Sequence, residues 1–180
     1  GCKSRSAQQE QPGETADAQQ NAPESVVPTE PDTTVTIAAV GDIMMYDEQL
    51  DAARQDDGTY DFTSSFAAVS GSTVSADLTV GNLELNFCGE PYSGKPDFRA
   101  PESLAKTLSS IGFDVLQTAN TYSIQNGLSG LQSTIRYLDA AGLSHVGTYA
   151  AQDDKTSLGG VLLKNVNGVK IAFIAYTKGL

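Results

Sequence analysis

The chain has 180 residues and a formal net charge of -11, a size that suits one ordinary domain with an appendage. So acidic a protein is a poor partner for nucleic acid or anionic lipid, because both are bound largely through Lys and Arg. The two cysteines do not imply a disulfide framework, and no run approaches the roughly 18 apolar residues of a membrane-spanning helix.

Residues 1–33 are predicted to form a disordered tether, because they are rich in Gln, Glu, Pro and Ala and contain no aromatic residue. Gly1 and Cys2 followed by a polar linker resemble the end of a bacterial lipoprotein signal, in which the cysteine becomes the lipid-bearing first residue of the mature protein. We therefore expect an extracytoplasmic protein that is lipid-anchored to the bacterial membrane through Cys2. The alternative is that Gly1 is a remnant of expression and Cys2 an incidental thiol.

Residues 34–180 are predicted to form the globular part, and its first half alternates β-rich and helical signals. The strand segments are short and mostly apolar, as in strands that are buried on both faces. In chain order we expect a strand at 34–40, helical segments around 46–54 and 62–69, a strand at 76–84 and a long Gly/Pro-rich loop at 88–101.

The second half shows a more regular pattern. Leu104, Leu108 and Ile111 fall on one helical face after Pro101, which is well placed to begin a helix. The expected elements are this helix, a strand at 113–119, a polar loop at 120–129, a helix with Leu131, Ile135 and Leu138 on one face, and a strand at 143–147.

A hairpin is predicted at 161–176, because Asn167 and Gly168 between two apolar segments favour a type I′ turn. Strand–helix–strand crossovers imply parallel central strands. The predicted fold class is therefore α/β, with a mixed sheet and flanking helices.

Four oxygen-bearing side chains follow neighbouring strands of the predicted sheet. Asp42 follows the first strand, Asn82 and Glu84 lie on one side of the second, and Asn120 follows the third. Ligands bind beyond the carboxyl ends of parallel strands. Carboxylate and amide oxygens suit a hard divalent ion, so the four residues are candidate ligands for Mg²⁺ or Mn²⁺.

Each candidate ligand also has a structural interpretation. Asp42 could be a turn or capping residue, and Asn120 could cap its own loop. Glu84 could pair with Lys95 or Arg99. The only histidine, His145, is interpreted as a structural residue of a strand. Neither nucleophile motifs nor glycine-rich phosphate loops are present in the sequence.

Several short segments resemble the CapA family of bacterial capsule and poly-γ-glutamate synthesis proteins in order and spacing. They are AVGDIMM (39–45), GNLE (81–84), FRAP (98–101), GFDVLQTAN (112–120), GLSGL (127–131), AGL (141–143) and GVKIAF (168–173). The resemblance implies the N-terminal part of a metallophosphatase-like α/β/β/α sandwich with a divalent-metal site. By this match, Asp42 is the first metal-binding aspartate, and Asn82 and Glu84 belong to the Asn-Leu-Glu motif.

The sequence departs from the family pattern after Asn120. Where the family has Ala-Asn-Asn-His and then an aspartate, this chain has Thr121, Tyr122 and Gln125. Tyrosine is a poor replacement for imidazole near neutral pH, so the metal site is predicted to be altered or lost. A further histidine motif is expected beyond Leu180, which makes 34–180 a truncated domain.

Three functions follow from these observations. The first is a surface-anchored protein that takes part in capsule or poly-γ-glutamate synthesis or export. The expected partners are then the membrane, through the lipid on Cys2, and an anionic surface polymer or its synthesis machinery. The alternatives are a metal-dependent phosphoesterase completed by residues beyond 180, and a non-catalytic module that binds a polymer or a partner.

Overall fold

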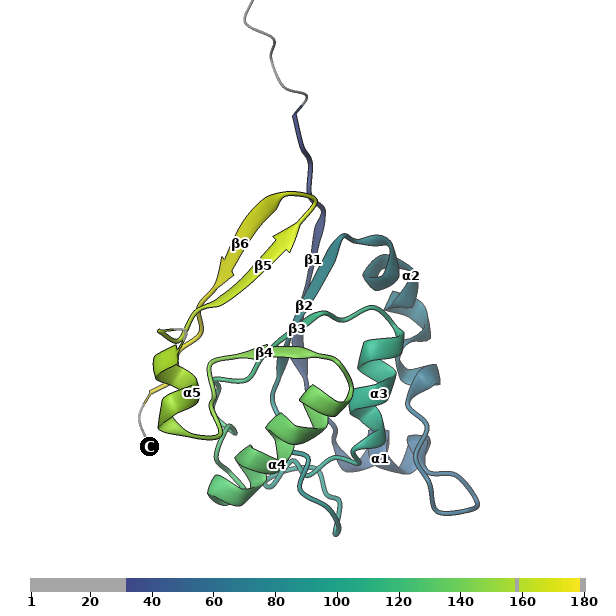
Figure 1. Ribbon diagram of the computed structural model, residues 1–180. Helices are drawn as coiled ribbons and strands as arrows, with labels where there is room; N and C mark the ends of the chain where they lie inside the picture. The colour runs from purple at the N-terminus through teal and green to yellow at the C-terminus, as the bar shows by residue number, and fades with distance from the viewer. Residues whose placement is uncertain (1–31, 158, 179–180) are drawn as a thin grey trace, which may run out of the picture. The chain divides into compact units, whose positions relative to one another are not determined.

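The structure is a computed structural model that describes residues 32–157 and 159–178. The predicted tether, residues 1–33, therefore lies outside the described residues except for its last two positions. Among the helices in the described ranges, none has the length and apolar character needed to cross a membrane. The predicted α/β fold class is confirmed, with helices and strands along the chain as in Figure 1.

The elements follow the predicted order. The first half contains β1 (Ile37–Ile43), α1 (Asp47–Ala53), the 3₁₀ helix η1 (Thr63–Phe66), α2 (Ala67–Ser75) and β2 (Leu78–Leu83). The second half contains α3 (Ser103–Ser110), β3 (Val115–Gln117), α4 (Gly127–Ala140), β4 (Ser144–Val146), α5 (Gln152–Ser157), β5 (Leu162–Val166) and β6 (Val169–Phe173). Only α5 was not predicted, because its polar sequence carries no apolar periodicity.

The strands β1, β2, β3 and β4 form one parallel sheet in chain order. Helices connect successive strands, as parallel neighbours require. Leu83 at the end of β2 pairs with Ile43 at the end of β1, and Asn82 pairs with Gln117 at the end of β3. The carboxyl ends of the strands therefore meet at one edge of the sheet.

One face of the parallel sheet is covered by helices. Its strands contribute Ile43, Leu83 and Leu116 to the larger buried core. The helices contribute Leu50 from α1, Leu104 and Leu108 from α3, and Leu138 from α4. Burial of such aliphatic side chains contributes about 1.5–3 kcal/mol each, so this layer fixes the sheet on which the candidate site lies.

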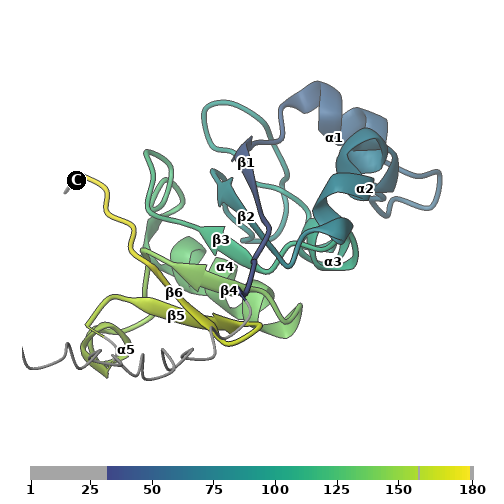
Figure 2. The ribbon, with the colours of Figure 1, turned by 90° about the horizontal axis from the view of Figure 1, so that it is seen from above.

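The opposite face of the sheet is covered by the β5–β6 hairpin. Leu78, Val115 and Val146 form a second buried cluster there, with Ile171 and Phe173 of β6 packed against it. Val115 and Leu116 thus point to opposite faces, as the pleat of a strand requires. Figures 1 and 2 show the hairpin on the other side of the parallel strands from α1, α2 and α3.

The parallel and antiparallel strands, which the sequence placed in one mixed sheet, lie in two sheets. The hairpin pairs only with itself among the described strands. Its apolar side chains alternate along each strand, and they pack face to face on the parallel sheet. Side-chain burial, rather than continuation of a ladder, therefore sets the position of the hairpin.

The strand β1 extends past residue 40, the predicted end of strand 34–40. Ala39 pairs with Val80, whereas Asp42 pairs with Asn82, so β1 holds one residue more than β2 between these pairs. This irregularity is a β-bulge, which often redirects a side chain beside a functional site. Here it allows the strand to continue and brings Asp42 directly opposite Asn82.

The predicted hairpin turn is confirmed. Asn167 has a φ of 52° and Gly168 a φ of 85°, as a type I′ turn requires at both central positions. The Nδ2 of Asn167 also donates a hydrogen bond of 3.2 Å to Oδ1 of Asp77, just before β2. The turn is therefore attached to the amino-terminal end of the parallel sheet.

The predicted long loop at 88–101 is ordered by two charged side chains. The guanidinium of Arg99 donates to the backbone carbonyls of Cys88, Gly89 and Glu90. The carboxylate of Glu102 accepts from the backbone N–H of Gly89 at 2.7 Å. These contacts fold the loop back on itself.

Candidate metal site

The structure brings the four predicted ligand residues together at the carboxyl edge of the parallel sheet. Asp42 and Asn82 are paired residues of β1 and β2. Glu84 directly follows β2, and its backbone N–H donates to the carbonyl of Ile43 at 3.1 Å. Asn120 lies three residues beyond the end of β3. The arrangement follows from parallel pairing, as the sequence analysis expected.

Asn82 connects the two carboxylates. Its Nδ2 donates to Oδ1 of Asp42 at 2.7 Å and to Oε2 of Glu84 at 3.1 Å. Both carboxylates therefore lie within hydrogen-bond distance of a single nitrogen atom. They converge on one point at the edge of the sheet, and that point is also where a bound cation would be most strongly attracted.

Asn120 completes the cluster from the third strand. Its Nδ2 donates to Oδ1 of Asn82 at 3.0 Å and to the carbonyl of Leu83 at 2.8 Å. Its Oδ1 accepts from the backbone N–H of Tyr122 at 3.1 Å. The expectation that Asn120 caps its own loop is thus met as well, and the residue serves both the loop and the cluster.

Burial raises the pKa of Glu84 above its ordinary value of 4.5, and the nearby charge of Asp42 raises it further. The hydrogen bond from Asn82 acts in the opposite direction. Two neighbouring carboxylates repel each other unless a cation or a donor lies between them. The NH₂ group of Asn82 is the donor in this structure.

The chemistry of the donor set fits one hard divalent ion. Asp42 and Glu84 supply carboxylate oxygens, and Asn82 and Asn120 each carry an amide oxygen, the ligand types that Mg²⁺ and Mn²⁺ prefer. Within residues 32–157 and 159–178, no group of three or more His, Cys, Asp or Glu side chains is placed to hold a metal. The described residues therefore offer two charged ligands and two neutral ones.

The residues that depart from the family pattern lie beside the cluster. Thr121 and Gln125 are exposed, whereas Tyr122 is half-buried. The ring of Tyr122 packs edge-on against Phe98, with the ring centroids 4.5 Å apart. Tyr122 therefore joins the aromatic rim of the core, a packing role that an imidazole would fill less well.

The surroundings of Glu84 and His145 test the structural interpretations of these two residues. Glu84 accepts from Asn82, and Arg99 donates to loop carbonyls, so the suggested pair between Glu84 and Arg99 is not formed. His145 lies within β4, with Nε2 3.8 Å from Oδ1 of Asp139. It belongs to the strand and not to the cluster, in agreement with its structural interpretation.

Two residues that support the site were missed in the sequence. The Oγ of buried Ser123 accepts from the backbone N–H of Asn120 at 2.7 Å and donates to the carbonyl of Thr118 at 2.6 Å. The Nδ2 of buried Asn86 donates to the carbonyl of Ser123 at 3.4 Å. The serine three residues after Asn120 was a local signal for this turn, whereas the contact with Asn86 was not visible locally.

This fold and this edge-of-sheet cluster define the class of protein. Residues 36–180 match the model of the family described as "Bacterial capsule synthesis protein PGA_cap". The match covers more than half of the chain, and the chain belongs to this family, which is metallophosphoesterase-like. The resemblance to CapA proteins noted in the sequence is thereby confirmed.

Individual relatives agree with this assignment. The chain is 29% identical to "Capsule biosynthesis protein CapA" of Bacillus anthracis over 149 residues, which are 79% of this chain and 34% of the relative. It is 26% identical to "PGA biosynthesis protein CapA" of Bacillus subtilis (strain 168) over 158 residues, 84% of this chain and 39% of the relative. The chain therefore spans between a third and two fifths of the length of these relatives.

A shorter match joins the chain to "Uncharacterized protein y4sH" of Sinorhizobium fredii. The identity there is 35% over 81 residues, which are 40% of this chain and 17% of the relative.

Proposed function

We propose that this protein takes part in the synthesis or export of a bacterial surface polymer, a capsule or poly-γ-glutamate. The observation that carries the proposal is the family match over 36–180, together with relatives that are named for capsule and PGA biosynthesis. Because the chain spans little more than a third of those relatives, the role of the whole protein is inferred through the family.

The cluster at the sheet edge is the proposed cation site of this function. Asp42 and Glu84 would hold one divalent ion through their carboxylates. The NH₂ group of Asn82 faces both carboxylates in this structure, so its amide oxygen would become a neutral ligand once the side-chain amide turns over. Asn120 would follow the same change, because its Nδ2 donates to Oδ1 of Asn82. A bound ion supplies a positive centre that attracts carboxylate or phosphate oxygens of a polymer or its precursor. Ser123 keeps Asn120 in position, and the carboxylates provide the charge that retains the ion.

A bridging cation would also reduce the repulsion between this acidic protein and an anionic polymer. The chain carries a net charge of -11, so an anionic polymer would be repelled from most of its surface. At the cluster, a divalent ion would neutralise Asp42 and Glu84 and leave its remaining positions for the polymer. The pair of carboxylates thus supports a role in holding an anionic chain.

Hydrolysis of phosphoesters remains the enzyme alternative. Two-metal phosphoester chemistry needs ligands for both ions and an activated water. The described residues supply two carboxylates and two amides at the edge of the sheet, which suits a single ion. Hydrolysis by this mechanism would require ligands in addition to these four residues.

The proposed location of the protein is the outer side of the membrane, where a lipid on Cys2 would anchor it. Cys2 lies outside the described residues, so the proposed anchor is supported by the sequence of the tether. Growth of the source bacterium with a radioactive fatty acid should label the protein, and a Cys2→Ser variant should carry no label. An unlabelled native protein would exclude the anchor.

The role in polymer production is tested by gene deletion and complementation in the source bacterium. Polymer recovered from washed cells should fall on deletion and return with the native gene. The double variant Asp42→Asn, Glu84→Gln should fail to restore it, whereas Asp56→Asn, an exposed acidic residue elsewhere, should restore it fully. Unchanged polymer after deletion would refute the proposed function.

A further inference from the structure

A chain of hydrogen bonds joins the turn after β3 to the carboxylates of the candidate metal site. The backbone N–H of Tyr122 donates to Oδ1 of Asn120 at 3.1 Å. The Nδ2 of Asn120 donates to Oδ1 of Asn82 at 3.0 Å. The Nδ2 of Asn82 in turn donates to the carboxylates of Asp42 and Glu84. Each bond runs from the turn toward the carboxylates, so the orientation of each amide sets the orientation of the next.

Two backbone groups fix the direction of this chain of hydrogen bonds at Asn120. Its Oδ1 faces the N–H of Tyr122, which can only donate, and its Nδ2 faces the carbonyl of Leu83 at 2.8 Å, which can only accept. A reversed amide at Asn120 would place its NH₂ group against the N–H and its oxygen against the carbonyl. Asn120 thus presents its NH₂ group to Asn82, which can only present its oxygen in return. The NH₂ group of Asn82 is therefore held toward the two carboxylates.

A divalent ion that is held by all four residues of the cluster requires the opposite orientation of both amides. Asn82 can offer its oxygen to the ion only if its NH₂ group turns away from the carboxylates. That NH₂ group then faces Asn120, whose own amide has to turn over to accept from it. The oxygen of Asn120 is thereby withdrawn from the N–H of Tyr122. The backbone of the turn therefore opposes the change unless the turn itself rearranges.

The backbone of Asn120 is anchored, so the rearrangement falls on the peptide group before Tyr122. The Oγ of Ser123, a residue 8% exposed, accepts from the N–H of Asn120 and donates to the carbonyl of Thr118. The N–H of Tyr122 has the side chain of Asn120 as its acceptor, and the preceding residue, Thr121, is exposed. The peptide group between Thr121 and Tyr122 can therefore rotate while the rest of the turn stays in place.

We propose that Asn120 is a positioning residue that couples cation binding at the sheet edge to the conformation of the turn at 120–123. With a cation bound, the amides of Asn82 and Asn120 are reversed and the N–H of Tyr122 loses its acceptor. This inference rests on the proposed cation site and adds a conformational response to it. Because such coupling is reciprocal, a ligand that favours one conformation of the turn changes the affinity for the cation.

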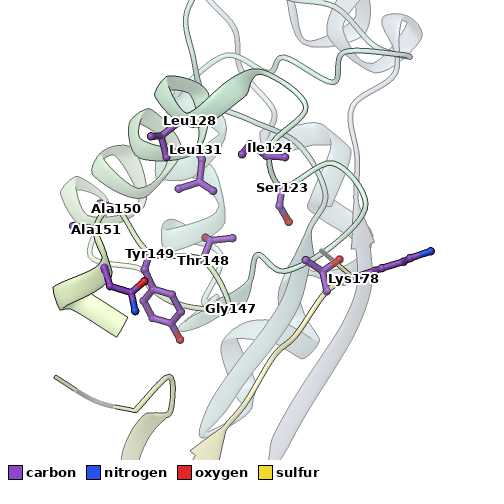
Figure 3. Close-up of a pocket in the computed structure, with 12 residues that line it drawn as sticks. Ser123, Ile124, Leu128, Leu131, Gly147, Thr148, Tyr149, Ala150, Ala151 and Lys178 are labelled. Carbon is purple, nitrogen blue, oxygen red and sulfur yellow. The ribbon is translucent and has the colours of Figure 1, made fainter. Parts of the chain in front are cut away.

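The response of the turn reaches a second surface of the protein. Ser123 and Ile124 line a cavity of about 600 Å³ together with Leu128 and Leu131 of α4 (Figure 3). Ile124 is 38% exposed, so this end of the turn lies at the surface. A change in the turn therefore alters one wall of the cavity, and the state of the cation site is transmitted to it.

Hydrogen exchange of single backbone amides, followed by NMR spectroscopy at one pH with and without saturating Mg²⁺, tests the coupling. We expect the amide of Tyr122 to exchange about fivefold faster or more with Mg²⁺, the change produced by the loss of one hydrogen bond. The amide of Glu84, which donates to the carbonyl of Ile43 beside the same carboxylates, should not exchange faster. Calorimetry on the same protein measures the binding of Mg²⁺ independently.

Two variants of the turn assign the response to Asn120. In Asn120→Ala the acceptor is absent, so the amide of Tyr122 should exchange fast both with and without Mg²⁺. Thr121→Ala, at the exposed neighbour, should respond to Mg²⁺ as the native protein does. Binding of Mg²⁺ without faster exchange at Tyr122, or a native response in Asn120→Ala, overturns the coupling and leaves the cation site standing. Absence of Mg²⁺ binding overturns both.

Discussion

Asn82 is the residue on which the geometry of the cluster depends. Its amide donates to Asp42 and Glu84 and accepts from Asn120. The sequence predicted that these four side chains would meet, because parallel strands bring their carboxyl ends to one edge. It did not predict that an amide would lie between the carboxylates, since that depends on side-chain orientation.

Replacing the donor at position 82 tests this arrangement. We expect Asn82→Asp to lower the free energy of unfolding at pH 7 by about 1–3 kcal/mol, because both carboxylates lose their donor and gain a third charge as a neighbour. Urea denaturation without added metal measures the change. The exposed Asn165→Asp on the hairpin is the matched control, and equal stability of the two variants would argue against a bridging role for Asn82.

His145 makes stability depend on pH in a predictable direction. Burial lowers its pKa below the ordinary value of 6.5, while Asp139 and Asp154 act in the opposite direction. The unfolded chain therefore binds the proton more readily, and stability present above pH 6.5 is lost as the pH falls through and below that value. The chain contains no other histidine, so this change is assignable.

Urea denaturation at pH 7.5 and pH 5.5 measures the effect, and we expect the native protein to be less stable at the lower pH. The variant His145→Gln should lose much less stability between the two pH values, because glutamine does not titrate. Carboxylates respond mainly at lower pH and are common to both proteins. An equal loss of stability in both proteins would contradict a buried neutral histidine.

Local sequence determined some elements well and others poorly. The Asn167–Gly168 turn was predictable because positive φ at both positions is a property of the two residues alone. The division into two sheets was not predictable from local patterns, because it depends on packing of Phe173 and Ile171 against Val115. The β-bulge in β1 was missed for the same reason, since register belongs to a pair of strands.

The glycine of the turn and a glycine of α2 respond oppositely to the same substitution. A Cβ at Gly168 or at Gly71 would meet no atom within 4 Å, but only Gly168 has a positive φ, of 85°. We expect Gly168→Ala to destabilise the protein by about 1 kcal/mol. Gly71→Ala, inside α2, should stabilise it by about 0.5–1 kcal/mol.

Thermal or urea denaturation of the two alanine variants provides the comparison, and each variant serves as the control for the other. Changes of the same sign in both variants would show that backbone conformation at the turn does not limit the stability of the hairpin.

For the whole molecule, membership of the family indicates more about the function than the composition does. The net charge of -11 argued against anionic partners, yet the proposed function gives the protein a surface polymer that is itself acidic as its partner. An acidic protein can hold an acidic polymer only if its negative charge is unevenly distributed or if a cation lies between the two. The paired carboxylates at the sheet edge provide a place for such a cation.

The central claim is that Asp42, Asn82, Glu84 and Asn120 form one cation site, and calorimetric titration of the protein with Mn²⁺ tests it most directly. We predict that about one ion binds per chain and that Asp42→Asn and Glu84→Gln each weaken binding about tenfold or more. Asp56→Asn should bind as the native protein does. Absence of binding to the native protein, or equal binding by all three variants, would contradict the claim.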